Sequence, residues 1–462
     1  MRASRVLAHL LPALAALLSA CSFIPVYERP AAPVAAAFPQ PAATAGTPAP
    51  ELGWGDFMAD ARLKALVELA LQNNRDLRIA VLNVEQTRAQ LGLQRADQWP
   101  TLNAGAAASR TPTAGGGIAS SYSLGLQVTA FELDLFGRVK SLSEAALARY
   151  LASDEGRRAA QVALVAGVAQ ADLALRADEE LLLLTQRTLA ARTDTLKLVQ
   201  LKFDGGAAAE PELRAAQSLV AGARVSLAAL QRQRSVDANA LTLLVGQPLP
   251  ATLPGASDWR ALRFADVPAG LPSDVLLQRP DVRQAEQLLI AANAHIGAAR
   301  AAFFPRITLT GSAGFASTQL SGLFDHTAWT FAPQLLQPIF DHGRNESNLA
   351  AARAGREIAV AQYEKAIQSA FREVADALAG RSTLAEQLAA QQAQADAEVR
   401  RLELAELLYR GGVASALDRL DTERSTLAAR QAVVQLQLAQ LQNAVQLYRV
   451  LGGGAPAAAT VR

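Results

Sequence analysis

The feature that most constrains this sequence is an internal repeat, because two similar stretches of chain are expected to fold alike. Five short landmarks recur at an offset of 205 or 206 residues: Asn74–Arg78 with Arg279–Arg283, Arg95–Pro100 with Arg300–Pro305, Phe136–Arg138 with His342–Arg344, Phe203–Gly206 with Tyr409–Gly412, and Val245–Gly246 with Leu451–Gly452. We therefore divide most of the chain into a first repeat, 54–253, a linker, 254–271, a second repeat, 272–455, and a tail, 456–462.

Each repeat begins with a helix and a pair of strands. Helices are expected over 76–98 and 281–302, and Pro100 and Pro305 stop them. Two stretches of alternating apolar and polar residues follow each helix, separated by turns at 110–121 and 317–322 that are rich in Gly, Ser and Thr. This pattern predicts β-hairpins with strands of about ten residues, the length that a tilted strand needs to cross a membrane.

A very long helix is expected after each hairpin. No proline occurs over 138–203 or 344–410, so each segment can form a rod of roughly 100 Å. Apolar residues in the first segment recur at the seven-residue period of a coiled coil: Val168, Leu175, Leu182, Leu189, Leu196 and Phe203. A double glycine ends each rod, and returning helices begin at Pro211 and Ser415. Ser415 and Asp418 have the spacing of a capping box.

These elements predict a mixed α and β fold that is mainly α, with a shared sheet. Four strands cannot close a barrel, and open sheet edges are not tolerated in lipid. Each protomer should therefore give four strands to a transmembrane β-barrel built from several copies, with about eight strands in a dimer or about twelve in a trimer. The long helices would continue as a coiled-coil barrel on the periplasmic side.

The N-terminus has the features of a bacterial lipoprotein leader. Arg2 and Arg5 precede the apolar run 6–18, and the segment 18–21 reads Leu-Ser-Ala-Cys, which resembles a lipobox. We expect removal of a signal peptide, 1–20, lipidation of Cys21, and a Pro- and Ala-rich tether over 21–53. Ser22, rather than aspartate, follows the cysteine, which indicates sorting to the outer membrane.

Composition and motifs exclude several classes of function. The formal net charge is only +2, so no basic nucleic-acid surface is expected. The four histidines lack metal-ligand spacing, and no catalytic motif is found. We therefore expect no enzyme activity, no metal site and no cofactor other than the covalent lipid.

The chain resembles the outer-membrane factor family, typified by TolC, and most closely its lipidated OprM branch. The segment Phe131–Val139 is similar to that branch's strand-to-helix signature, and Trp54–Phe57 with the apolar positions after it is similar to its N-terminal pattern. The resemblance covers about 54–455. It implies a homotrimer with a 12-strand barrel in the outer membrane, serving as the exit duct of a tripartite efflux system. Its partners would be a periplasmic adaptor, also called a membrane fusion protein, and an inner-membrane pump of the resistance-nodulation-division type.

The resemblance also implies a periplasmic gate where the second long helix turns back. The gate residues would be Leu417, Asp418, Asp421 and Arg424, with a locking contact between Tyr409 and Glu212. The helix-hairpin tips that would contact the adaptor are Gly205, Gly206, Gly411 and Gly412. Some family members have an arginine at the position of Ala414, so a lock made by that arginine is absent here. The acids alone would equally suit the N-terminus of a helix.

Two other functions remain open from the sequence. One is a protein-secretion duct of the same family that serves a type I exporter, which the lipobox and the OprM-like signature disfavour. The other is a coiled-coil lipoprotein that forms no channel and scaffolds the envelope, which the membrane-length hairpins disfavour.

Overall fold

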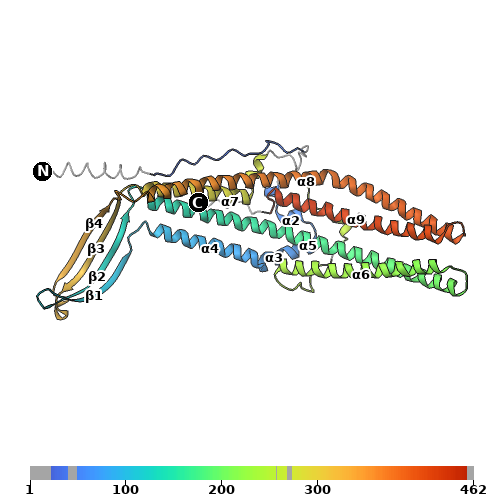
Figure 1. Ribbon diagram of the computed structural model, residues 1–462, viewed down its shortest axis with the longest axis horizontal. Coiled ribbons are helices and arrows are strands. Elements are labelled where there is room, and N and C mark those ends of the chain that lie inside the picture. Colours follow the sequence, from blue (N-terminus) through green and yellow to red (C-terminus); the bar gives the residue numbers. More distant parts are fainter. Residues whose placement is uncertain (1–21, 40–48, 256–257, 268–272, 455–462) are drawn as a thin grey trace. The chain divides into compact units, whose positions relative to one another are not determined.

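The computed structural model describes residues 22–39, 49–255, 258–267 and 273–454 (Figure 1). The first part of the chain holds η1 (Ala49–Glu51), α2 (Trp54–Phe57), α3 (Ala61–Asn73), α4 (Arg75–Ala96), β1 (Leu102–Pro112), β2 (Ile118–Leu133), α5 (Arg138–Asp204) and α6 (Glu210–Val245). The remainder holds η2 (Trp259–Ala261), η3 (Ser273–Gln278), α7 (Pro280–Ala301), β3 (Arg306–Ser317), η4 (Leu320–Gly322), β4 (Thr327–Leu336), α8 (Arg344–Arg410) and α9 (Ala416–Val450). The expected cleavage and lipidation positions lie outside the described residues.

The two repeats fold into matching series of elements. The helices before the hairpins, α4 and α7, have 22 residues each, and the long helices α5 and α8 have 67 residues each. The predicted mainly helical fold with four strands and an internal repeat is confirmed. Helix ends differ from the expected ones by one or two residues, and the capping box at Ser415 is present as expected.

The chain forms two compact units, and each unit draws on both repeats. One comprises Met1–Ala32, Val81–Glu155 and Arg283–Ala366, and the other comprises Pro33–Ala80, Gly156–Val282 and Ile367–Arg462. We call them the strand unit and the tip unit, because the first contains the sheet and the second contains the ends of the long helices. The compact units therefore cut across the sequence repeats, since α5 and α8 each contribute to both.

The strand unit contains one antiparallel sheet in the order β1-β2-β3-β4 (Figure 1). The pairing of β2 with β3 joins the two repeats. Gly125 lies opposite Gly314 in this pairing, and a β-carbon at Gly125 would lie 2.5 Å from the carbonyl oxygen of Ala313. The outer edges of β1 and β4 have no strand partner among the described residues. No helix in the described part of the chain is both long and apolar enough to cross a bilayer.

The core of the tip unit contains a stack of aromatic rings. The ring of Phe57 lies parallel to that of Tyr448, with ring centroids 4.0 Å apart. It also stacks on the ring of Phe264, with centroids 5.0 Å apart. The hydroxyl of Tyr448 donates to the carbonyl of Leu52 at 2.6 Å. The apolar residues of α3 that resembled the family pattern are fully buried: Leu63, Leu66, Val67 and Ala70. That pattern therefore marks the packing of α3 and α2 into the tip unit.

A buried cluster of charges joins α3 to α5 in the tip unit. The guanidinium of Arg176 contacts Asp172 at 2.7 Å and Asp60 at 2.9 Å, and Arg62 reaches Asp172 at 3.2 Å. Asp60 also caps α3 by accepting from the backbone N–H of Leu63. The side chain of Asp172 is fully buried, so its charge depends on these arginines.

Removing the central carboxylate should destabilise the tip unit. We expect Asp172→Ala to lower the free energy of unfolding by about 3–5 kcal/mol, because it leaves Arg176 buried without one of its partners. Asp194→Ala is the matched control on the same helix, since Asp194 pairs with Lys197 in an exposed position, and its effect should be about 0–1 kcal/mol. Helical circular dichroism during denaturation measures both, and equal effects would contradict the assignment.

Candidate functional site

The ends of α5 and α8 have the same backbone structure. Gly206 and Gly412 adopt left-handed φ values of 71° and 73°, which favour glycine. The backbone N–H of Ala207 donates to the carbonyl of Lys202 at 2.7 Å, and that of Val413 donates to Leu408 at 2.9 Å. These six-residue hydrogen bonds close each helix as a Schellman motif does. The double glycines therefore end the helices as predicted, while their contact with an adaptor stays a prediction.

The side chain of Tyr409 is the meeting point of four helices of the tip unit. Its hydroxyl donates to Glu212 on α6 over a long 3.5 Å and accepts from the ammonium of Lys202 on α5 at 3.3 Å. The guanidinium of Arg419 on α9 lies 5.4 Å from the centre of the ring. The predicted neighbours Tyr409 and Glu212 are thus brought together, but in a larger group. We call Lys202, Glu212, Tyr409 and Arg419 the tip cluster.

Charged groups in the tip cluster are arranged around the hydroxyl of Tyr409. The ammonium of Lys202 lies 5.3 Å from the Tyr409 ring centre, farther than from the hydroxyl oxygen, so its main contact is the hydrogen bond. A cation and a carboxylate thus both bind the hydroxyl, and Arg419 adds an attraction to the ring. The cluster links α5 and α6 to α8 and α9 entirely through side chains.

A second polar contact between helices involves Arg192, which lies ten residues before Lys202 on α5. Arg192 is buried and forms an ion pair with Glu423 on α9 at 2.8 Å, and it also donates to the carbonyl of Leu219 on α6. Sequence reasoning missed Arg192, Lys202 and Arg419. The seven-residue apolar period directs attention to leucines, and it carries no information on which polar side chains reach across to another helix.

Asp418 begins α9 as part of a capping box. Its carboxylate accepts from the hydroxyl of Ser415 at 2.7 Å and from the Ser415 backbone N–H at 3.2 Å, while the Ser415 hydroxyl accepts from the Asp418 N–H. The hydrogen bonds from the Ser415 side chain and backbone lower the pKa of Asp418. The stability that they contribute is therefore present at neutral pH, and it is lost only as the pH falls through that lowered pKa.

The other predicted gate residues lie on the same first turns of α9. Asp421 pairs with Arg424 at 2.6 Å and lies 3.7 Å from Arg401 on α8. Within one chain its carboxylate is therefore balanced by two guanidinium groups. Leu417 belongs to α9, but its side chain lies outside what the structure describes. The gate role of all four residues stays a prediction.

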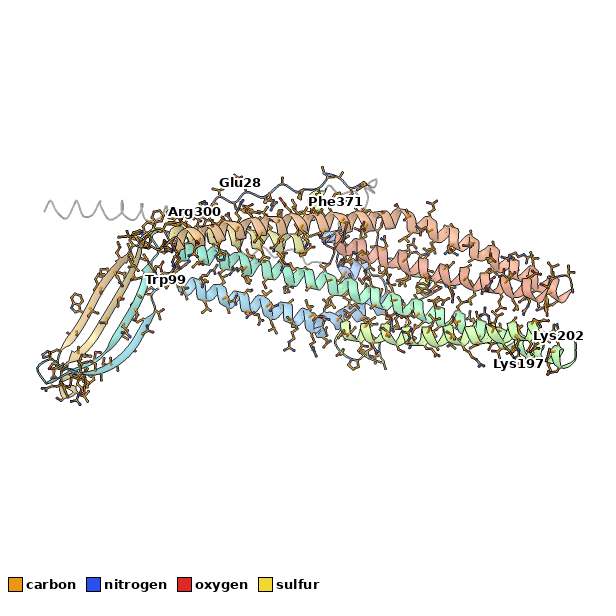
Figure 2. The ribbon with its side chains drawn as sticks, in the orientation of Figure 1. Glu28, Trp99, Lys197, Lys202, Arg300 and Phe371 are labelled. Atoms are coloured by element: carbon orange, nitrogen blue, oxygen red, sulfur yellow. The ribbon has the colours of Figure 1, made fainter. Side chains whose placement is uncertain are left out.

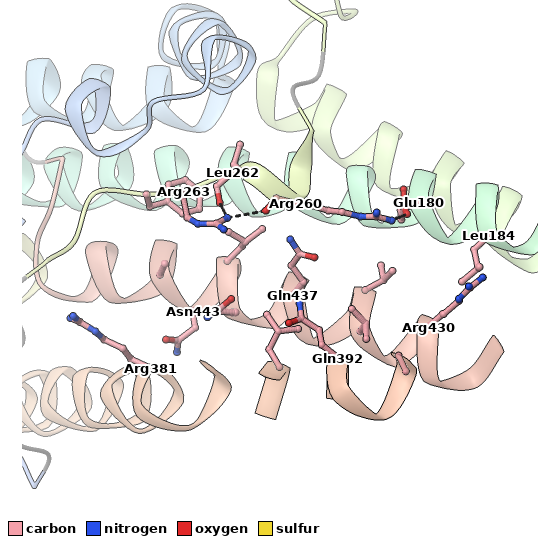
Figure 3. Close-up of a pocket in the computed structure, with 18 of the residues that line it drawn as sticks. Glu180, Leu184, Arg260, Leu262, Arg263, Arg381, Gln392, Arg430, Gln437 and Asn443 are labelled. Carbon is pink, nitrogen blue, oxygen red and sulfur yellow. Dashed lines mark hydrogen bonds and ion pairs between the residues drawn. The ribbon is translucent and has the colours of Figure 1, made fainter. Parts of the chain in front are cut away.

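The tip unit also contains a cavity of about 1070 Å³ between α5, the segment 260–267, α8 and α9 (Figure 3). Three of the arginines around it contact groups of the protein itself. Arg260 pairs with Glu180, and Arg381 pairs with Asp266 at 2.7 Å. Arg263 donates to two backbone carbonyls of its own segment. These contacts tie the linker between the repeats to α5 and α8.

Comparison with known sequences identifies the family. The family described as "Outer membrane efflux protein" matches residues 66–247 and 271–453, once in each repeat. The chain is 47% identical over 407 residues to the outer membrane protein OprJ of Pseudomonas aeruginosa, covering 86% of this chain and 85% of that protein. It is 45% identical over 411 residues to the antibiotic efflux pump outer membrane protein ArpC of Pseudomonas putida, with the same coverage of both chains.

Solved structures agree with this assignment. The open state of the Neisseria gonorrhoeae MtrE outer membrane channel is 42% identical and matches with a TM-score of 0.88, covering 94% of this chain and 99% of that one. The Campylobacter jejuni CmeC outer membrane channel is 26% identical with a TM-score of 0.86, covering 94% of this chain and 95% of that one.

The chain therefore belongs to the outer membrane efflux protein family, and the resemblance to the outer-membrane factors is confirmed. It is an outer-membrane exit duct of an efflux system. This result favours efflux over the two alternatives, protein secretion and a scaffold that forms no channel.

Proposed function

We propose that this duct works as a homotrimer that receives small toxic molecules from an inner-membrane pump of the resistance-nodulation-division type through a periplasmic adaptor. The observation that carries the proposal is the four-stranded sheet whose outer edges, at β1 and β4, pair with no strand in the described part of the chain. Backbone groups along those edges need partners in lipid, and neighbouring copies supply them. Three copies give one closed sheet of about twelve strands.

Exposed leucines near both helix turns support contacts with other chains. Leu198 and Leu201 on α5, and Leu404 and Leu407 at the equivalent positions on α8, are between 45 and 70% exposed. Exposed apolar rows of this kind favour packing against further helices. Neighbouring copies cover part of these rows, and the adaptor contacts the glycine turns beside them.

The substrates are small antibiotics and organic solvents, since relatives include an antibiotic efflux pump protein and a toluene efflux pump protein. Deleting the gene should lower the minimal inhibitory concentration of several unrelated antibiotics and reduce survival in toluene, and a plasmid copy should restore both. The purified protein should have the mass of a trimer in mild detergent. Unchanged susceptibility together with loss of one secreted protein would instead indicate a type I exporter duct, and a stable monomer would contradict the shared sheet.

The tip cluster holds the duct closed at rest, and Leu417, Asp418, Asp421 and Arg424 line the constriction. Closure needs α8 and α9 to stay against α5 and α6, and the contacts of Lys202 and Glu212 with Tyr409 join these pairs. Each contact is partly exposed and one is long, so the lock is weak enough to open when partners bind.

Replacing Lys202 should therefore loosen the gate. We expect Lys202→Met to raise the ratio of open to closed channels about fivefold, because losing about 1 kcal/mol of hydrogen bonding shifts the equilibrium by that factor. Single-channel recordings in planar bilayers measure the change. Lys197→Met is the matched control, because Lys197 lies five residues earlier on α5 (Figure 2) and pairs with the exposed Asp194. A Lys202→Met channel that behaves like the control would contradict the lock.

A lipid on Cys21 anchors each protomer to the outer membrane, as the lipobox-like sequence indicates. We expect radioactive palmitate to label the natural protein and not a Cys21→Ser variant. The variant should also retain its leader and migrate as a larger band. Labelling that persists in Cys21→Ser would contradict acylation at this residue.

A further inference from the structure

The segment that follows the lipidated position packs along one face of α7 in the strand unit. Residues 22–29, here called the strap, contain no helix or strand. The contacts on α7 come from side chains seven residues apart, Glu286, Asn293 and Arg300, which lie along one stripe of a helix. The strap runs antiparallel to α7, because its first residues contact Arg300 and its last contact Glu286.

Polar contacts of the strap are specific at both of its ends. Arg300 donates to the carbonyl of Phe23 at 3.2 Å, and the side-chain amide of Asn293 donates to the carbonyl of Pro25 at 2.7 Å. Arg29 contacts both carboxylate oxygens of Glu286, at 2.7 and 3.1 Å, and the Tyr27 hydroxyl donates to the same group at 3.0 Å.

The Glu286 side chain is nearly buried, and two side chains of the strap contact its carboxylate. Only 10% of that side chain is exposed. Burial and the neighbouring carboxylate also raise the pKa of the Tyr27 hydroxyl, which keeps it a donor. Lifting the strap would break the ion pair with Arg29 and the hydrogen bond from Tyr27, which is unfavourable. This stripe is therefore a built binding site for residues 23–29.

A glycine in α7 makes room for the strap. A β-carbon at Gly297 would lie 2.5 Å from Cγ1 of Ile24 and 2.9 Å from the Ile24 backbone nitrogen, and it would also meet the Ser141 hydroxyl at 2.7 Å. Glycine is unfavourable within a helix, and this close approach of another segment gives it a physical reason here.

Aromatic stacking places the start of the strap beside the strand ends. The ring of Phe23 stacks on Phe304 at 4.7 Å, and Phe304 stacks on Phe136 at 4.9 Å. Phe304 precedes β3 by two residues, and Phe136 follows β2 by three residues. Phe23 is itself two residues after Cys21, and two residues of chain span at most about 7 Å.

We propose that the strap is a positioning device that fixes the lipid anchor at the level where the strands meet the helices. Seated on α7, it holds the anchor and the sheet in register, so that the acyl chains enter the membrane where the strands do. An unseated strap would act only as a loose tether and would not help to orient the sheet for insertion. This inference rests on the proposed lipidation of Cys21.

A spin label on the strap tests whether it is seated. Val26 is 87% exposed, so Val26→Cys can carry a nitroxide without displacing a contact. In the mature lipoprotein the sulfur of Cys21 is blocked, so one label per chain is expected. Two labels per chain would show that Cys21 is free, which would contradict the anchor and, with it, this inference. One label with a fully mobile spectrum in the otherwise natural trimer would contradict the seated strap alone.

Two glycine substitutions then distinguish an effect on the strap from a general effect of replacing glycine in a helix. Helix propensity favours alanine in both, but Gly297→Ala meets the strap, whereas a β-carbon at Gly355 on α8 meets nothing within 4 Å. We expect Gly297→Ala to give a mobile label and about threefold less protein in the outer membrane, and Gly355→Ala to match the parent in both.

Substitutions in the strap itself keep the test independent of α7 folding. Ile24→Ala and Arg29→Gln should each mobilise the label and reduce the outer-membrane yield, while Arg353→Gln, an exposed arginine on α8, should do neither. A label that stays immobile in all strap variants would overturn the assigned contacts. A mobile label with an unchanged yield would overturn the positioning role.

Discussion

The hydrogen-bonding groups along the two outer strands set the conditions for the rest of this protein. A four-stranded sheet satisfies its inner strands, but among the described residues one edge of β1 and one of β4 have no strand partner. Such edges are stable in lipid only if strands of other chains pair with them. Within one chain, each sequence repeat contributes one hairpin to the same sheet. The close contact of Gly125 with Gly314 lies at the seam between those halves, where no side chain fits.

Much of the fold could be predicted from the sequence because its signals are long and periodic. Absence of proline over 67 residues, a seven-residue apolar period and paired double glycines specify the long helices and their ends. Alternation correctly predicts four strands, but the expected turn at 110–121 is too long, because β1 ends at Pro112 and β2 begins at Ile118. Strand β2 has 16 residues and contains an irregularity between Val128 and Phe131. Alternation cannot foresee this irregularity, because it depends on how the neighbouring strand pairs.

The candidate site was less accessible to sequence reasoning. Tyr409 and Glu212 were identified through a family resemblance, and they do lie together. Lys202 and Arg419 were missed, because an isolated cation on a helix reads as a solvated side chain unless its neighbour across the bundle is known. The strap was missed for a similar reason. Its Pro- and Ala-rich composition indicates an extended tether, but composition does not predict which residues of α7 the strap contacts.

The tip cluster has a further consequence for symmetry. Shifting by the repeat offset of 206 residues places Leu408 at the position of Lys202, Phe203 at that of Tyr409, and Leu213 at that of Arg419. Only Glu212 has a chemically similar counterpart, Asp418. The duplicated helix pairs thus resemble each other in backbone and leucines, yet the described residues form this polar cluster once per chain. In a ring of three chains, the helices would have nearly sixfold symmetry. The side-chain contacts of the tip clusters would have only threefold symmetry. Neighbouring helix pairs around such a ring would then be joined by different numbers of polar contacts, so the ring would not be mechanically uniform.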